Sequence, residues 1–154
     1  MISQMNELRV NIHMHTPYSD GHRTHSQIAE AGMQSELNAV IVTDHNVLVQ
    51  GPEKYYQNEH SRILLIVGEE IHDQTRQPQK NHLLVLGIRR ELAQLASDTQ
   101  GLIDIVNREG GLTFLAHPTD PASPAVGEPD LSWVDWEVYG YTGFEIWNAM
   151  SEFK

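Results

Sequence analysis

Two histidines separated by one residue, with an aspartate shortly after them, form the first group of side chains that could do chemistry. The chain reads His-Met-His-Thr-Pro-Tyr-Ser-Asp-Gly from position 13 to 21, which makes the three residues His13, His15 and Asp20. Alternate side chains of a strand point to the same side, so both imidazoles can face one point. Divalent transition metals accept imidazole nitrogen together with carboxylate oxygen. The segment therefore predicts part of a metal site.

Further metal-ligating residues occur beside other apolar runs. His45, Glu70 and His117 follow such runs, and His82 precedes one. A single strand histidine is usually structural, but a hydrophobic core does not need this whole set. Glu69 and Glu70 compete for one ligand position. A centre with two metals lowers the pKa of a bound water and polarises the oxygen under attack. The sequence thus predicts a hydrolytic metal centre.

The elements that must position these residues alternate between strand and helix patterns. Alternation of this kind predicts an α/β fold with a largely parallel sheet or barrel. In such folds functional residues gather at the carboxyl ends of the strands. His82 opens its strand, so that strand must be antiparallel or offset to bring it to the same rim. The expected strands are 8–14, 39–43, 63–67, 82–88, 112–116 and 143–148, and the expected helices are 24–37, 52–60, about 98–109 and a short one over 133–138.

Composition narrows the function classes. A length of 154 residues predicts one domain, residues 1–154, and the absence of cysteine excludes disulfides and thiolate metal sites. The formal charge of −11, from 21 acidic and 10 basic residues, argues against a surface that binds nucleic acid. No apolar run is long enough to span a membrane, and residues 1–7 lack the pattern of a signal peptide. A cytoplasmic location is the default expectation.

Several other residues keep two interpretations. Asp44 is either an acceptor for a ligand imidazole or a helix cap. Arg23 could hold a phosphate oxygen or lie in solvent at the start of a helix. The remaining histidines are expected at the surface or behind the ligands, and His22 could also contact the substrate; they are His22, His25, His60 and His72. The tryptophans are expected to pack in the protein rather than to form a substrate cage; they are Trp133, Trp136 and Trp147.

These motifs resemble the PHP (polymerase and histidinol phosphatase) superfamily of metal-dependent phosphoesterases. The resemblance covers nearly the whole chain. It implies a distorted β/α barrel with seven strands in the family, about six of them present here, and two or three metals at the strand ends. The matching pieces are the His-Met-His-Thr and Ser-Asp-Gly motifs, Thr43-Asp44-His45, Gly68-Glu69-Glu70-Ile71, His82 with Leu86-Gly87, Ala116-His117-Pro118 and the strand Phe144-Glu145-Ile146-Trp147-Asn148.

The resemblance also implies a distribution of ligands. His13, His15 and Glu70 would hold one metal, and Glu70 would bridge to another. Asp20 and His45 would serve a further metal, and they are the predicted catalytic residues. His82 and His117 would complete the bridged site together with Glu70. The resemblance favours Glu70 over Glu69 as the ligand, and the implied cofactors are two or three ions of manganese, iron or zinc.

One departure from the family pattern limits this expectation. Family members end with an Asp-x-His motif on a seventh strand, and no such motif follows His117 here. Either the polypeptide belongs to a longer protein, or it is a truncated member with impaired chemistry. An open barrel edge would leave backbone groups unpaired, which favours association. We therefore expect an oligomer, such as a homo-oligomer, or a partner segment to cover that edge.

The expected function is hydrolysis of a phosphate ester by a hydroxide held between divalent metals. A small phosphomonoester or a nucleotide is the expected substrate, because the short acidic chain offers no surface for nucleic acid, and no membrane partner is expected. Two alternatives stay open. The same centre could hydrolyse a carbamate or an aryl ester, a chemistry that the resemblance includes. The chain could also be a metal-binding or interaction module without activity.

Overall fold

The structure is a computed structural model of the chain, and it describes residues 6–152. Seven strands, three α-helices and one short 3₁₀ helix account for its regular structure within that range. In chain order they are β1 (Val10–Met14), α1 (His25–Gln34), β2 (Ala39–His45), β3 (Lys54–Gln57), β4 (Arg62–Ile71), β5 (Leu83–Leu86), η1 (Ala93–Leu95), α2 (Thr99–Arg108), β6 (Leu112–Leu115), β7 (Gly143–Phe144) and α3 (Ala149–Glu152).

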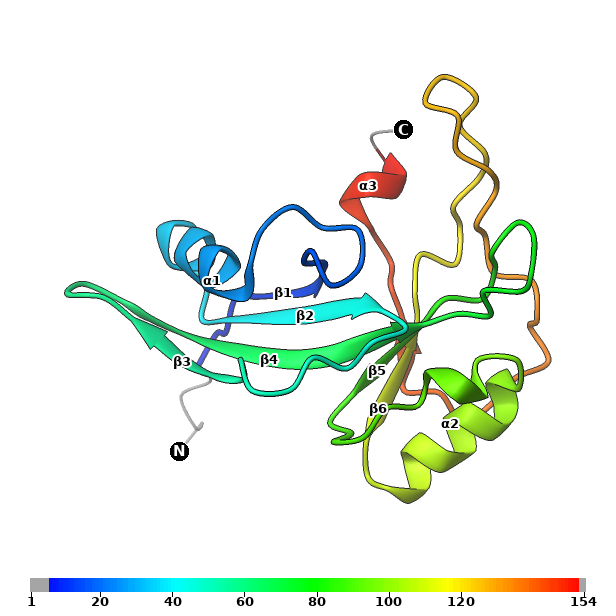
Figure 1. Cartoon of the computed structure of the whole chain (residues 1–154), viewed down its shortest axis with the longest axis horizontal. Helices are drawn as coiled ribbons and strands as arrows, with labels where there is room; N and C mark the ends of the chain where they lie inside the picture. The colour runs from blue at the N-terminus through cyan, green and yellow to red at the C-terminus, as the bar shows by residue number, and fades with distance from the viewer. Residues whose placement is uncertain (1–5, 153–154) are drawn as a thin grey trace, which may run out of the picture.

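All seven strands belong to one mixed sheet in the order β1-β2-β4-β5-β6-β7, with β3 paired to the outer part of β4. The β1–β2, β2–β4 and β6–β7 pairs are parallel, and the β4–β5 and β5–β6 pairs are antiparallel. The sheet curls sharply between β4 and β5 and forms a half-barrel (Figure 1). The predicted α/β fold, an incomplete barrel of the PHP type, is confirmed.

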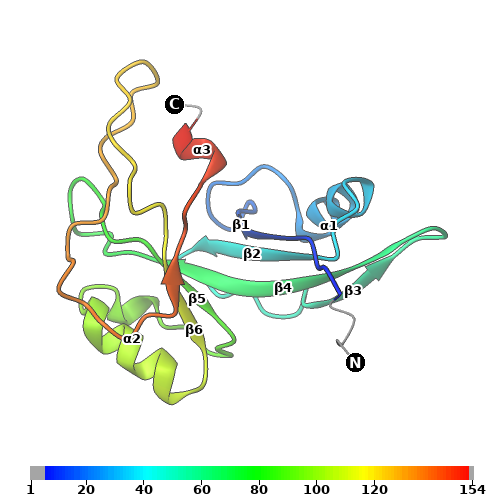
Figure 2. The same ribbon diagram turned by 180° about the vertical axis from the view of Figure 1, so that it is seen from behind.

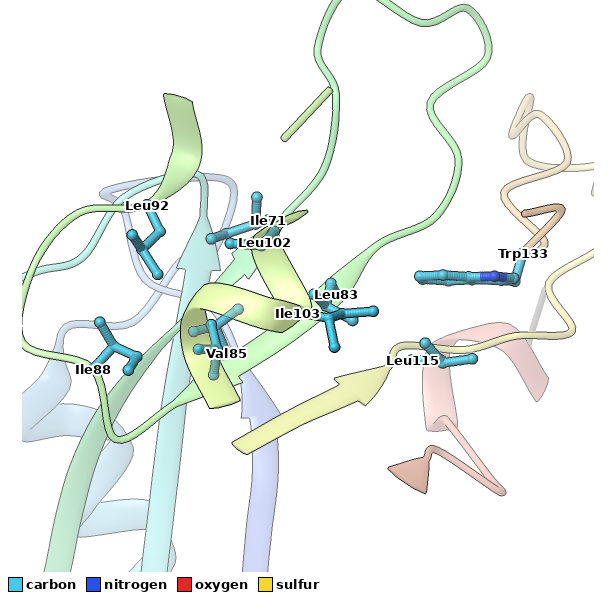
Figure 3. Close-up of a cluster of buried hydrophobic side chains, with 10 residues drawn as sticks. Ile71, Leu83, Val85, Ile88, Leu92, Leu102, Ile103, Leu115 and Trp133 are labelled. Atoms are coloured by element: carbon cyan, nitrogen blue, oxygen red, sulfur yellow. The ribbon is translucent and has the colours of Figure 1, made fainter. Parts of the chain in front are cut away.

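Two hydrophobic clusters cover the two halves of the curled sheet. One lies under α1, which contacts β2 and β4 and buries Ile28 and Ala29 against Val40 and Ile63. The other joins α2 to β5 and β6, where Leu102 and Ile103 pack on buried leucines, and Trp133 closes it (Figure 3). The view from behind shows α1 and α2 at opposite ends of the sheet (Figure 2). Polar side chains lie at the rim between these two clusters.

Local sequence explains where both long helices begin. Thr24 caps α1: its hydroxyl accepts from the Gln27 N–H, and the Gln27 side chain accepts from the Thr24 N–H. Asp98 caps α2 by accepting from the Gly101 N–H. Thr24 and Asp98 stand at the first positions of the expected helices 24–37 and about 98–109.

Residues 52–60, expected as a helix, contain β3 instead. Tyr55 and Tyr56 favour a strand, and β3 pairs antiparallel with β4 as a hairpin. Lys54 lies 4.9 Å from the centre of the Tyr56 ring, and the Arg62 guanidinium lies 5.2 Å from that of Tyr55. The expected helix at 52–60 is therefore wrong, because cross-strand pairing with β4 determines the structure of this segment.

The short helix expected at 133–138 is also wrong. The Asn81 side-chain oxygen accepts from the N–H groups of Val134 and Asp135, so a side chain supplies the partners that a helical turn would have supplied. The last expected strand, 143–148, is reduced to Gly143–Phe144. Within residues 6–152, no helix is long and apolar enough to cross a membrane.

Candidate metal centre

Strand geometry brings the predicted ligands to one rim of the half-barrel. β2 and β4 run parallel, and their register places His45 beside Glu70. β5 runs antiparallel to β4, so His82, which precedes it, arrives at the same rim. This is the arrangement that the position of His82 required. His117 follows β6, and His13 lies on β1.

Glu70 is the centre of the site. Its carboxylate is fully buried, and five imidazoles surround it. One oxygen, Oε2, lies 2.8 Å from His13 Nε2, 3.2 Å from His15 Nε2 and 3.3 Å from His45 Nδ1. The other oxygen, Oε1, lies 2.8 Å from His82 Nδ1 and 3.1 Å from His117 Nε2. Each oxygen thus faces its own set of imidazoles, as a bridging carboxylate does.

Asp20 closes the more exposed side of the site. Its Oδ1 lies 3.6 Å from His15 Nδ1, and its Oδ2 lies 3.6 Å from His45 Nε2. The residue that follows must be glycine, because a Cβ at Gly21 would lie 2.0 Å from the His15 carbonyl oxygen. That close approach folds the loop back so that Asp20 reaches the histidines.

Among the residues that the structure describes, three groups of side chains place their ligand atoms within 4.8 Å of one another, close enough to hold a metal ion. The first is the set that the resemblance implied, the second adds His15 to the implied pair, and the third has His45 in place of the implied His117. His117 reaches Glu70 but belongs to none of these groups. The groups are His13, His15 and Glu70; His15, Asp20 and His45; and His45, Glu70 and His82.

The donor atoms fit divalent cations better than they fit hydrogen bonding alone. A carboxylate accepts about four hydrogen bonds, fewer than the five imidazoles around Glu70. Among the described residues, buried nitrogens of four of these imidazoles have no hydrogen-bond partner: His15 Nδ1, His45 Nδ1, His82 Nε2 and His117 Nδ1. Buried polar atoms without partners are costly unless they serve a ligand. Imidazole nitrogens and a carboxylate in this arrangement fit divalent cations.

Glu70 also shapes the ionisation of the site. Burial by itself lowers the pKa of His13, but the Glu70 charge and the hydrogen bond with Glu145 outweigh it and raise that pKa to about 10. Burial by itself raises the pKa of Glu70, yet the charge of His13 and the hydrogen bonds from His117, His13 and His15 bring it well below its usual value. A cation would replace the positive charge that the His13 proton supplies.

Two other histidines are held neutral. Burial is the main reason that the pKa of His45 is lowered. The pKa of His72 falls to about 4, first through burial and then through the neighbouring His82 and His45. His72 was expected at the surface or behind the ligands, and it is buried, with its ring stacked 4.3 Å from that of His82. Neutral imidazole is the form that binds metals.

The two adjacent glutamates have opposite surroundings. They alternate along β4, so Glu70 faces the imidazoles and Glu69 faces the other side of the sheet. Glu69 is buried, hydrogen-bonds to Glu91 and accepts from the Leu92 N–H. Burial, followed by this contact with Glu91, raises the pKa of Glu69 to about 9. The geometry agrees with the choice of Glu70 as the ligand.

Asp44 takes neither of its two expected roles. Its buried carboxylate accepts from the Thr16 N–H at 2.6 Å, from the Thr16 hydroxyl at 2.7 Å and from the Ser19 hydroxyl at 2.9 Å. The carboxylate therefore fastens the loop that carries Asp20 to the end of β2. Thr16 and Ser19 in the first motif were the available signal for this contact.

Glu145 contacts two candidate ligands, and the sequence analysis did not predict this contact. Its Oε1 lies 2.8 Å from His13 Nδ1, and its Oε2 accepts from the His117 backbone N–H at 2.7 Å. The sequence placed it only on a strand. Its distance along the chain from both histidines left no local signal of the contact.

The remaining candidates lie at the margins of the site. His22 and His60 are exposed, as expected, whereas His25 is buried at the start of α1. Trp133 packs in the core, but Trp136 and Trp147 are 59% and 62% exposed, against the expectation of packing. Arg23 borders a second cavity beside α1 and not the one at the metal ligands.

A cavity of about 610 Å³ opens over the candidate ligands. Its walls come from β1 on one side and from residues 145–151 on the other. The described residues that line it include no lysine or arginine. Ile12, Leu131 and Trp147 give it an apolar part beside the imidazoles and carboxylates.

Comparison with known proteins agrees with this fold. The model of the PHP domain family matches residues 11–139, and the chain belongs to that family. An uncharacterized protein of Methanocaldococcus jannaschii is 21% identical over 132 residues, which cover 79% of this chain and 74% of the relative.

A solved structure gives a similar fold. A two-domain protein from Bacteroides vulgatus that contains a predicted PHP-like metal-dependent phosphoesterase superimposes with a TM-score of 0.50 at 19% identity. The match covers 83% of this chain but only 39% of the solved chain. The chain is thus similar to one part of that larger protein.

Proposed function

We propose that this chain is a metal-dependent phosphoesterase that hydrolyses a small phosphomonoester or a nucleotide. The observation that carries the proposal is the buried Glu70 carboxylate, which offers each of its oxygens to a separate set of imidazoles. A hydrophobic core does not require such a cluster of polar side chains. Membership of the PHP domain family supports the same reaction class.

Two or three divalent ions of manganese, iron or zinc would be held by the three groups described above. When bound, such ions lower the pKa of a water and withdraw negative charge from the phosphoryl group. Glu70, His82 and His117 form the buried part of the centre. Asp20, whose side chain is 67% exposed, and His45 lie on its open side, where they can orient the substrate and accept a proton.

A second candidate activity is hydrolysis of an aryl ester or a carbamate. The observation that favours it is the cavity wall. Its described residues supply no cationic side chain for a phosphate, and Trp147 and Leu131 offer an apolar surface for an aromatic group. A neutral ester would need no positive charge beyond that of the metals.

Turnover of paired substrates tests both activities. The purified chain, loaded with Mn²⁺ or Zn²⁺, is assayed with p-nitrophenyl phosphate and with p-nitrophenyl acetate, which share a leaving group. The proposal expects faster hydrolysis of the phosphate, abolished in Glu70→Gln and retained in Glu69→Gln. Faster hydrolysis of the acetate would favour the ester activity. Bound metal without turnover of either substrate would favour a binding module.

We also propose that a second copy of the chain covers the open side of the half-barrel. β1 and β7 are the two ends of the described sheet, and each pairs with a neighbour on one side. Exposed apolar side chains lie at or beside these strands, among them Val10, Phe144 and Ile146. Unpaired strand edges flanked by apolar residues favour association.

A further inference from the structure

Glu145 directly follows β7, and its side chain contacts His13 of β1 and His117 at the end of β6. Its backbone N–H donates to the Leu115 carbonyl at 2.9 Å, which continues the parallel pairing of β7 with β6 by one residue. Side chains alternate along this segment. Phe144 and Ile146 are 55% and 92% exposed, whereas the Glu145 side chain between them is only 6% exposed. The pairing therefore turns the carboxylate inward, toward the metal centre.

The two carboxylate oxygens bind two different candidate ligands. Oε1 meets His13 Nδ1 at 2.8 Å, and Oε2 accepts from the His117 backbone N–H at 2.7 Å. The Asn148 side-chain amide also donates to Oε2, at 3.4 Å. Glu145 thus joins residues that are 132 and 28 positions away in the chain.

The contact with His13 decides which imidazole nitrogen faces the centre. Nδ1 points to Glu145, and Nε2, on the opposite edge of the ring, points to Glu70 at 2.8 Å. An imidazole that donates its Nδ1 proton to a carboxylate keeps its Nε2 lone pair for a metal. Glu145 lies behind His13 as seen from Glu70, so it orients a ligand and does not act as one itself.

The contact of Glu145 with His117 holds the His117 backbone and not its imidazole ring. His117 has a φ of 27°, a left-handed conformation that side-chain-bearing residues rarely adopt. This turn sends the imidazole back to the rim, where Nε2 lies 3.1 Å from Glu70 Oε1. A carboxylate bound to the N–H of the same residue stabilises the turn.

We propose that Glu145 is a positioning residue that fixes the His13 ring and the His117 backbone so that both Nε2 atoms face Glu70. The proposal rests on the metal centre proposed above. Because the two histidines approach different oxygens of Glu70, the loss of Glu145 disturbs both sides of the bridging carboxylate at once.

Metal affinity tests this role. The full chain and its Glu145→Gln and Glu145→Ala variants are titrated with Zn²⁺ by calorimetry, with the exposed Glu53→Ala as the control. Loss of an orienting carboxylate weakens metal binding by about 10–100-fold. Alanine is expected near the upper end of this range. Glutamine is expected near the lower end, because its amide can accept from only one of the two N–H groups.

A spectroscopic measurement separates positioning from general stability. In the zinc-loaded protein, the long-range ¹H–¹⁵N spectrum should show His13 with its proton on Nδ1. That signal should shift or broaden in Glu145→Gln and stay unchanged in Glu53→Ala. Glutamine preserves the volume of the side chain, so it decides the test if the alanine variant fails to fold.

Equal Zn²⁺ affinity and an unchanged His13 signal in Glu145→Gln would overturn the proposal. Failure of the wild-type chain to bind Zn²⁺ would overturn the metal centre and, with it, this role. Zinc binding without hydrolysis would count against the proposed function alone, because the affinity and the His13 signal would still report on Glu145.

Discussion

Glu69 and Glu70 are adjacent in sequence, but their pKa values shift in opposite directions. Side chains alternate between the two faces of β4, so Glu70 faces the imidazoles and Glu69 contacts Glu91. We predict that Glu70→Gln weakens Mn²⁺ or Zn²⁺ binding by more than about 100-fold, because a direct ligand matters more than the groups that orient ligands. Glu69→Gln is the matched control and should bind normally. Calorimetry measures both, and equal affinities would contradict the assignment of Glu70.

Glu69 should make stability depend on pH. Its pKa is raised to about 9 in the folded chain, from a usual value of 4.5. The folded state thus keeps a proton that the unfolded state loses, so stability is fully present below about pH 4.5 and falls as pH rises toward 9.

The Glu69→Gln variant should remove this loss. We expect its free energy of unfolding at pH 8.5 to exceed that of the wild type by more than about 1.4 kcal/mol, the equivalent of one pKa unit. Urea unfolding at pH 6 and pH 8.5 measures the difference. A variant that loses stability in parallel with the wild type would show that Glu69 is ionised in the folded chain.

The site residues differ in how far sequence could predict them. Five site residues lie on or after apolar runs, and the carboxyl ends of neighbouring parallel strands lie at a common rim. They are His13, His15, His45, Glu70 and His117. Glu145 has no such signal. Its contacts depend on the register of β7 with β6, which is set by backbone pairing across a long loop. Long-range register of this kind cannot be derived from local pattern.

At the scale of elements, the loop after β1 depends on one carboxylate from β2. Asp44 accepts from Thr16 and Ser19 and so sets the position of Asp20. Hydrogen bonds to a charged group each contribute about 1.5–3 kcal/mol, and buried donors left without an acceptor cost more. We predict that Asp44→Ala lowers the free energy of unfolding by about 3 kcal/mol or more.

The same variant should release the loop locally. Limited proteolysis should cut Asp44→Ala within residues 16–23 under conditions that leave the wild type intact. Ser19→Ala removes one of the three hydrogen bonds, so its rate of cleavage should lie between those of the wild type and Asp44→Ala. A proteolysis pattern identical to that of the wild type would mean that Asp44 is not what holds the loop.

Where the predicted secondary structure was wrong, contacts with residues far along the chain determine the observed structure. Residues 54–57 became a strand because β4 extends far enough to pair with them. Residues 133–138 stayed irregular because the Asn81 side chain supplied acceptors for their N–H groups. Local pattern was sufficient where it coincided with burial, as in β2, β4 and α2, and insufficient where a distant group competed.

At the scale of the whole molecule, a half-barrel leaves two sheet edges. β1 and β7 end the described sheet, and the cavity over the candidate ligands lies between β1 and residues 145–151. The formal charge of −11 opposes association at long range, but salt screens it. Edge pairing and apolar contact act at short range and are not screened in this way. Self-association should therefore strengthen as the salt concentration rises.

Lysine substitutions on the edges should abolish this association. A charged side chain on an edge strand blocks strand addition. Val10, 42% exposed on β1, and Ile146, 92% exposed beyond β7, are the positions to change. Leu112 is the matched control, because it is 47% exposed but lies on β6, inside the sheet. We expect Val10→Lys and Ile146→Lys to be monomeric and Leu112→Lys to dimerise like the wild type in sedimentation velocity. A wild type that stays monomeric at high protein and salt concentration would contradict a second copy as the cover of the open side.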